Sequence, residues 1–138
     1  MKFTRKATAS WKGSGLEGKG SITTQSTTLD QAQLSFKTRF EEGVGTNPEE
    51  LIAAAHSGCF SMKLSFVLAD LGYTADSIDT TANVTFEDGK ITLIHLDLIA
   101  KIPGITEEDF QKAAVDAKEN CPISQLLNTT ITLAAKLV

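Results

Sequence analysis

The two cysteines of this chain, Cys59 and Cys121, are its strongest candidates for a chemical role. A free cysteine often serves only as a small buried apolar residue, so packing alone is the first interpretation. Three chemical interpretations compete with it: a structural zinc site, a cysteine–histidine hydrolase, and thiol redox chemistry. The residues that accompany each cysteine bear on all three.

The histidines concern the zinc and hydrolase interpretations. His56 lies three residues before Cys59 on one helix face. Cys121 and His95 could complete a set of two sulfur and two nitrogen ligands. However, the chain has no Cys-x-x-Cys knuckle, and the four residues come from scattered elements, which speaks against zinc. As a hydrolase base, His56 is poorly placed because it points back along the same rigid helix, and a mid-strand His95 suits a core or solvent-facing role.

Thiol redox chemistry requires a thiolate, a cation that lowers its pKa, and a second thiol that captures the resulting sulfenic acid. Cys59 is expected in the middle of a buried helix, where burial raises the thiol pKa and no helix N-terminus lowers it. Arg39 is the only arginine besides Arg5. A guanidinium held by a carboxylate could bind both a thiolate and a peroxide oxygen. Four glutamates near Arg39 could hold it: Glu41, Glu42, Glu49 and Glu50.

The element that positions Cys59 is a long helix predicted over residues 46–72. Asn47 is a suitable N-cap, Pro48 suits the first helical position, and Glu50 follows the cap by three residues, as in a capping box. The helix is small and apolar almost all round, so we expect it inside the fold or at a subunit interface. His56, Lys63 and several serines interrupt its apolar surface, which argues against a membrane span.

The remaining chain predicts an α+β fold of antiparallel sheets wrapped around two helices. Alternating apolar and polar residues predict strands, Asp88-Gly89 predicts a tight hairpin turn, and Thr106 is a suitable helix cap. The strand after the turn is apolar on both sides over 91–98, so we expect it to be central and covered on both faces. The expected elements are strands over 3–12, 19–27, 34–40, 78–86, 90–102 and 131–137, a helix over 107–119 and a helical turn over 122–127.

Length and composition favour one cytoplasmic domain over residues 1–138. A chain of 138 residues with 41% apolar and 22% charged residues can bury a core without disulfide bonds. The charged N-terminus has no apolar segment behind it, so we expect no signal peptide. A net charge of −4 without a basic patch argues against nucleic acid as a partner. The glycines at 13–20 are spaced as in a hairpin, not as in a phosphate loop.

Several runs of this sequence together resemble one known family, the OsmC branch of the OsmC/Ohr hydroperoxide reductases. The most specific are N-P-E-E-L-I-A-A-A-H-S-G-C-F-S-M over 47–62 and C-P-I-S over 121–124. The runs F-K-T-R-F over 36–40, S-I-D-T-T-A over 77–82 and I-P-G-I over 102–105 agree with it, as does A-S-W-K-G over 9–13. The resemblance extends in register over essentially the whole chain.

This resemblance implies a peroxiredoxin-like dithiol peroxidase that prefers organic hydroperoxides, acts in osmotic and oxidative stress, and forms an intertwined homodimer. It needs no metal or other cofactor, and a dithiol such as dihydrolipoamide or a lipoylated protein recycles it. Cys59 matches the peroxidatic position, Cys121 the resolving one, Arg39 the activating arginine and Glu49 the carboxylate that orients it. Four apolar residues are candidate walls of the hydroperoxide pocket or core residues: Phe36, Phe40, Phe60 and Met62.

Helix geometry adds a constraint of its own. Glu49 and Cys59 are ten residues apart, which is ~15 Å along a continuous helix. One Arg39 head group cannot reach both within a single chain unless the helix breaks. We therefore expect each site to take both cysteines from one chain and Arg39 with Glu49 from the other. A non-enzymatic module that binds an apolar ligand, with incidental thiols, is the alternative function.

Overall fold

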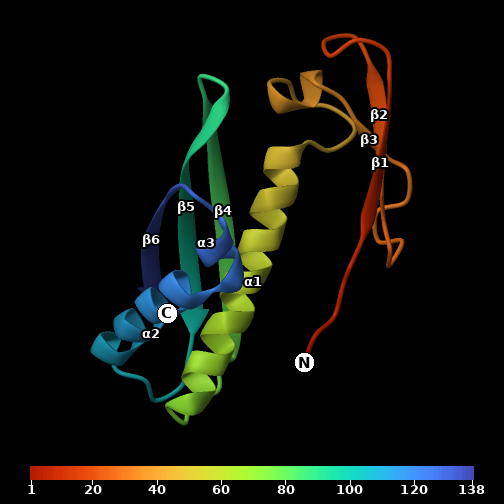
Figure 1. Cartoon of the computed structure of the whole chain (residues 1–138). Coiled ribbons are helices and arrows are strands. Elements are labelled where there is room, and N and C mark those ends of the chain that lie inside the picture. Colours follow the sequence, from red (N-terminus) through yellow and green to blue (C-terminus); the bar gives the residue numbers. More distant parts are fainter. The chain divides into compact units, whose positions relative to one another are not determined.

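A computed structural model describes all residues, 1–138, and the chain divides into two compact units, 1–51 and 52–138 (Figure 1). The expectation of one domain over the whole chain stays a prediction.

The first unit is built on a three-stranded antiparallel sheet of β1 (Ala7–Lys12), β2 (Lys19–Thr24) and β3 (Ala32–Leu34), in that order. Trp11 lies opposite Gly20 in the register of β1 and β2. A Cβ at Gly20 would come within 2.6 Å of the Trp11 ring, so only glycine fits beneath it. The predicted hairpin around the glycines at 13–20 and the edge position of β1 are confirmed.

The strand predicted over 34–40 is wrong. Only Leu34 belongs to a strand there, and Lys37–Arg39 forms a short 3₁₀ helix, η1. The hydroxyl of Ser35 accepts from the Thr38 backbone N–H at 3.3 Å, and the Thr38 hydroxyl donates to the Ser35 carbonyl at 2.7 Å. These local side-chain bonds offer the backbone an alternative to the sheet ladder, which the alternation of apolar residues does not reveal.

The second unit contains a sheet in the order β4 (Ser77–Glu87), β5 (Lys90–Lys101) and β6 (Thr130–Leu137). The predicted hairpin is confirmed: Asp88 and Gly89 both have positive φ, as a two-residue turn of this kind requires. β5 is central, as predicted. The sheet is not fully antiparallel, because β5 and β6 pair in parallel. The chain returns between them through α2 (Glu107–Asn120) and α3 (Pro122–Leu126).

Within this chain β5 is covered on one face only, which corrects the expectation of cover on both. Ile94, Leu96, Leu98 and Ala100 are buried, whereas Asp97 and Ile99 on the opposite face are exposed. The polar residues of the opposite face are compatible with contact to solvent. The apolar run at 91–98 suggested cover on both faces because some of its apolar residues belong to this second, less buried face.

The helices pack on the buried face of this sheet and close one hydrophobic core. The Thr106 side chain accepts from the Asp109 N–H at 3.1 Å, so the predicted cap of α2 is confirmed. The predicted apolar stripe of α2 is also buried: Phe110, Ala113, Ala114 and Ala117. These residues pack in the same cluster as Phe60, Leu64 and Leu68 of α1 (Pro48–Asp70) and the inner residues of β5.

One stripe of α1, spaced by four residues, is buried within this chain: His56, Phe60, Leu64 and Leu68. Met62 and Phe66 on the other side are 63% and 69% exposed, so the chain alone does not cover this helix all round. By length and composition alone α1 could also cross a membrane, but the core helix of a globular protein passes the same test.

Candidate functional site

Cys59 lies in the middle of α1, on the side that faces the start of α3. Residues 48–70 form an unbroken helix, so the thiol occupies a fixed position along it. Cys59 is only partly exposed, and it lies one position before the fully buried Phe60. Cys59 therefore lies at the margin of the core, where the residue is partly exposed and burial still acts on the charge of its thiol.

Cys121 occupies the junction between α2 and α3. It ends α2, its N–H donating to the Ala117 carbonyl at 2.9 Å, and it is also the N-cap residue of α3. Pro122 follows at the first position of α3, where its missing N–H costs nothing. Cys121 is fully buried, so only a neighbour inside the protein can reach its sulfur.

The structure brings the two sulfurs together. Both cysteines are free, and the Cys121 thiol donates a hydrogen bond to the Cys59 sulfur at 2.9 Å. The two residues are 62 positions apart in the sequence, so this contact depends on how the junction of α2 and α3 packs against α1. Two thiols in contact, one partly accessible and one buried, can form a disulfide after oxidation of the accessible one.

The environment within this chain favours the neutral form of Cys59. Burial raises the pKa of the Cys59 thiol above its ordinary value, and the neighbouring Cys121 thiol raises it further. A hydrogen bond with the backbone of Ile123, in the first turn of α3, acts in the opposite direction and lowers that pKa. The expectation that burial raises the pKa of Cys59 is therefore confirmed.

Ile123 is a contributor that the sequence reasoning missed, since no helix N-terminus was expected to help Cys59. Its backbone reaches the sulfur because α3 docks beside α1. The only signal in the sequence was Pro122 immediately after Cys121, which marks the start of a helix there.

A second contact between α1 and α3 lies beside the sulfurs. The His56 Nε2 and the Ser124 hydroxyl are 2.7 Å apart, and His56 is fully buried. Its other ring nitrogen, Nδ1, is buried without a hydrogen-bond partner. Burial lowers the pKa of His56 because the charged imidazolium is disfavoured in the core.

The zinc and hydrolase interpretations find no matching geometry. No group of three or more His, Cys, Asp or Glu residues is placed to hold a metal ion. His56 bonds Ser124, whereas His95 lies on the sheet, 2.6 Å from the Thr132 hydroxyl and 3.2 Å from an Asp97 carboxylate oxygen.

In the first unit, Arg39 and Glu49 form an ion pair. The Arg39 Nε is 3.2 Å from the Glu49 Oε2, and both side chains are largely shielded, with 29% and 14% of their areas exposed. Arg39 ends η1 and Glu49 lies in the first turn of α1. The Asn47 amide joins these elements by donating to the Thr38 carbonyl at 2.8 Å.

Local bonds at the start of α1 explain why Glu49, and not Glu50, faces the arginine. The Asn47 side chain caps the helix by accepting from the Glu50 N–H at 2.8 Å, as predicted. The Glu50 carboxylate accepts from the Thr46 hydroxyl at 3.0 Å. Glu50 thus supports the helix start, in agreement with its predicted structural role.

The four candidate pocket residues fall into different environments. Phe36 and Phe40 contact each other with ring centroids 5.2 Å apart, and the Arg39 guanidinium lies 5.9 Å from the Phe36 ring. Phe60 is fully buried in the core of the second unit, whereas Met62 is exposed. The pocket role of these residues stays a prediction.

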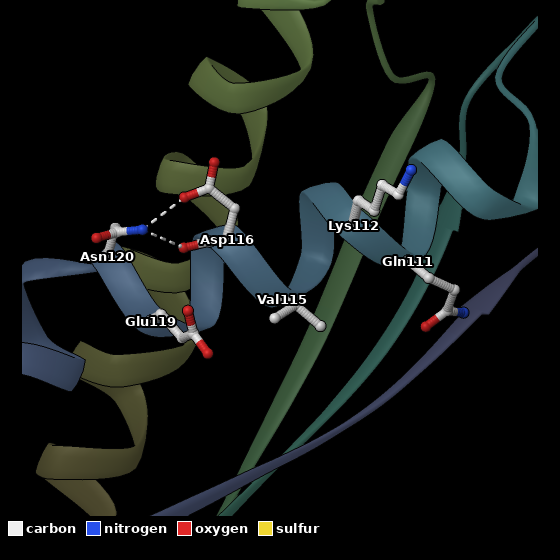
Figure 2. Close-up of a pocket in the computed structure, with 6 residues that line it drawn as sticks. All are labelled: Gln111, Lys112, Val115, Asp116, Glu119 and Asn120. Atoms are coloured by element: carbon white, nitrogen blue, oxygen red, sulfur yellow. Dashed lines mark hydrogen bonds between the residues drawn. The ribbon is translucent and has the colours of Figure 1, made fainter.

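Two hollows of the surface differ in how they relate to the candidate residues. One of about 460 Å³ lies in the first unit, with Arg39, Phe40 and Glu50 among its lining residues. Another, of about 420 Å³, lies on the outer side of α2 (Figure 2). Its side chains are those of an exposed helix face, and the Asn120 amide bonds Asp116 across it at 2.6 Å. None of the residues that line this hollow is a cysteine or a histidine. They are Gln111, Lys112, Val115, Asp116, Glu119 and Asn120.

Comparison with known proteins agrees with the sequence motifs. The model of the family described as "OsmC-like protein" matches residues 40–136. "Peroxiredoxin OsmC" of Escherichia coli is 45% identical over 141 residues, which cover 99% of each chain. "Organic hydroperoxide resistance protein-like 1" of Staphylococcus epidermidis is 30% identical over 88 residues, 61% of this chain and 63% of that one.

Solved structures share the fold. The organic hydroperoxide resistance protein OhrB of Bacillus subtilis has a TM-score of 0.69 at 27% identity, covering 97% of this chain and 98% of its own. An organic hydroperoxide resistance protein from Elizabethkingia anophelis has a TM-score of 0.74 at 26% identity, covering 100% and 99%. These likenesses confirm the predicted α+β class.

The buried His56 generates a prediction about stability and pH. Because its folded-state pKa is lowered, neutral His56 contributes stability that is present above about pH 6.5 and is lost as the pH falls through the folded-state pKa. We expect the urea midpoint of the wild type to fall more steeply than that of His56→Gln as the pH decreases below about 6.5. Midpoints of the two proteins that run parallel with pH would contradict this.

Proposed function

Because this chain belongs to the OsmC-like protein family, we propose that it is a thiol-dependent peroxidase that reduces organic hydroperoxides, and more weakly hydrogen peroxide. The observation that carries this proposal is the contact of the Cys59 and Cys121 sulfurs at 2.9 Å. A peroxidatic thiol needs a second thiol within reach, and these are the only two cysteines of the chain.

The first step oxidises Cys59. Its thiolate attacks the distal oxygen of R-O-O-H, the O–O bond breaks, and the alkoxide takes up a proton and leaves as an alcohol. Cys59 is then a sulfenic acid. Its partial exposure admits the hydroperoxide, and the Ile123 backbone offers a hydrogen bond to the charged sulfur.

The second step closes a disulfide. The Cys121 sulfur attacks the Cys59 sulfenic acid, the S–O bond breaks, and hydroxide leaves with the thiol proton as water. An external dithiol then reduces the disulfide by thiol–disulfide exchange and is itself oxidised. These reaction steps use no metal, flavin or haem. Fast closure also protects Cys59 from further oxidation.

The first step needs a positive charge that the surroundings of Cys59 in its own unit do not supply, because they raise its pKa. We propose that Arg39 stabilises the thiolate and that Glu49 orients Arg39. Glu49 and Cys59 lie on one unbroken helix, ten residues and hence ~15 Å apart. Each site therefore takes its cysteines from one subunit and its Arg39–Glu49 pair from the other subunit of a two-fold homodimer.

The proposal also assigns the walls of the substrate pocket, the reducing agent and the cellular location. Phe36 and Phe40 beside Arg39, together with the exposed Met62, are proposed walls for a bulky hydroperoxide, whereas Phe60 packs in the core. The reductant is a lipoyl-type dithiol or a lipoylated protein. The protein acts in the cytoplasm, in defence against oxidative and osmotic stress, as one domain over residues 1–138.

Substitution of each cysteine tests the two steps. We expect Cys59→Ser to abolish hydroperoxide consumption, because the attacking sulfur is gone. Cys121→Ser should consume about one equivalent and then stop, because no second thiol captures the sulfenic acid. Consumption of cumene hydroperoxide with a dithiol reductant is the measurement. Continued turnover by Cys59→Ser would refute the assignment.

A mixing experiment tests the shared site. Arg39→Ala and Cys59→Ser should each be inactive alone, but a mixed dimer pairs the intact Cys59 of one subunit with the intact Arg39 of the other. Random pairing of equal amounts places one such site in half of the dimers, so about a quarter of wild-type activity should return on co-refolding. If each chain builds its own site, the mixture stays inactive.

The choice of reductant is testable by turnover with a fixed hydroperoxide. We expect dihydrolipoamide to sustain faster turnover than thioredoxin or glutathione with their reductases. Equal or faster turnover with thioredoxin would contradict the lipoyl assignment and would leave the cysteine chemistry intact.

A further inference from the structure

The contact between His56 and Ser124 takes no part in the proposed peroxidase steps. It joins the same two helices as the sulfur contact, one turn away on each. His56 precedes Cys59 by three residues on one face of α1, and Ser124 follows Cys121, the N-cap residue of α3, by three. The pairs His56–Ser124 and Cys59–Cys121 are therefore neighbouring contacts between α1 and α3.

α3 needs such a contact to hold its position. It has only five residues, and a helix of this length is not stable by itself in water. Ser124 is its one buried residue, whereas Leu126 is 74% exposed. Within α3 the Ser124 hydroxyl is thus the buried side-chain attachment to the interior, and the buried Cys121 and the partly buried Leu127 flank it.

Breaking the hydrogen bond between His56 and Ser124 would also destabilise the surroundings of His56. His56 is fully buried, and its Nδ1 already lacks a partner. If Ser124 moved away, both ring nitrogens would be buried without a hydrogen bond, which folded proteins avoid. The imidazole therefore opposes displacement of α3 from α1.

We infer that His56 and Ser124 are positioning residues for the resolving step: their hydrogen bond holds the start of α3 so that Cys121 stays within reach of Cys59. This inference rests on the proposed function, since it concerns the capture of the Cys59 sulfenic acid by Cys121. It predicts that loss of the pair slows disulfide closure far more than the first oxidation by hydroperoxide, which depends on α3 only through the Ile123 backbone.

Single-turnover experiments separate these steps. Reduced protein is mixed rapidly with one equivalent of cumene hydroperoxide. Loss of hydroperoxide reports the oxidation of Cys59, and quenching followed by mass analysis reports disulfide, trapped sulfenic acid and sulfinic acid. In Ser124→Ala and His56→Leu we expect closure to slow roughly tenfold to a hundredfold, because a small displacement of a reacting group lowers the rate by about that factor. Hydroperoxide loss should change far less.

Two variants separate positioning from a general loss of stability. Ser61→Ala deletes a partly buried hydroxyl of α1 that lies 2.8 Å from the Thr80 hydroxyl on β4. It should close the disulfide at the wild-type rate. His56→Gln retains a side-chain amide that can bond Ser124 and should recover much of the closure rate that His56→Leu loses.

Each result has a definite meaning. Wild-type closure in Ser124→Ala would overturn the inference, because α2 alone would then hold Cys121. Equal slowing in Ser61→Ala would also overturn it. If the wild-type protein forms no Cys59–Cys121 disulfide, the proposed function fails, and this inference fails with it. With slow closure, a second equivalent of hydroperoxide should convert more Cys59 to sulfinic acid than in the wild type.

Discussion

The contact between the Cys59 and Cys121 sulfurs is the interaction on which the rest of the site depends. One sulfur lies on the longest helix of the chain, and the other lies at the junction of two shorter helices far along the sequence. The core of the second unit, which α1, α2 and the inner face of β5 build together, holds these elements in place. The fold thus acts as the support that places a buried thiol beside a partly accessible one.

The same burial that holds the sulfurs together opposes the charge that the chemistry needs. A thiolate at Cys59 is disfavoured by desolvation and by its neighbour Cys121, and the Ile123 backbone offsets only part of this effect. A cation fixed by a carboxylate can offset this effect, and of the lysine and arginine ion pairs in the chain only Arg39 with Glu49 is largely shielded from solvent. Because the unbroken helix separates that pair from Cys59 of the same chain, we propose a site shared by two subunits.

Local chemistry was readable from the sequence, whereas packing between distant elements was not. The Asp88-Gly89 turn, the Asn47 and Thr106 caps and the apolar stripe of α2 follow from short-range rules, and each was predicted. Residues 34–40 alternate like a strand, but Ser35 and Thr38 bond each other locally and turn the backbone. The parallel pairing of β5 with β6 and the approach of the Ile123 backbone to Cys59 depend on how α2 and α3 dock, which no local pattern specifies.

The most direct measurement is a count of free thiols in the reduced protein before and after one equivalent of an organic hydroperoxide, with peptide mapping of the product. Two thiols should be present before the reaction and none after it, with a single bridge between Cys59 and Cys121 within one chain. If both thiols remain free while the hydroperoxide persists, the protein is not a dithiol peroxidase, and a module that only binds an apolar ligand becomes the better description.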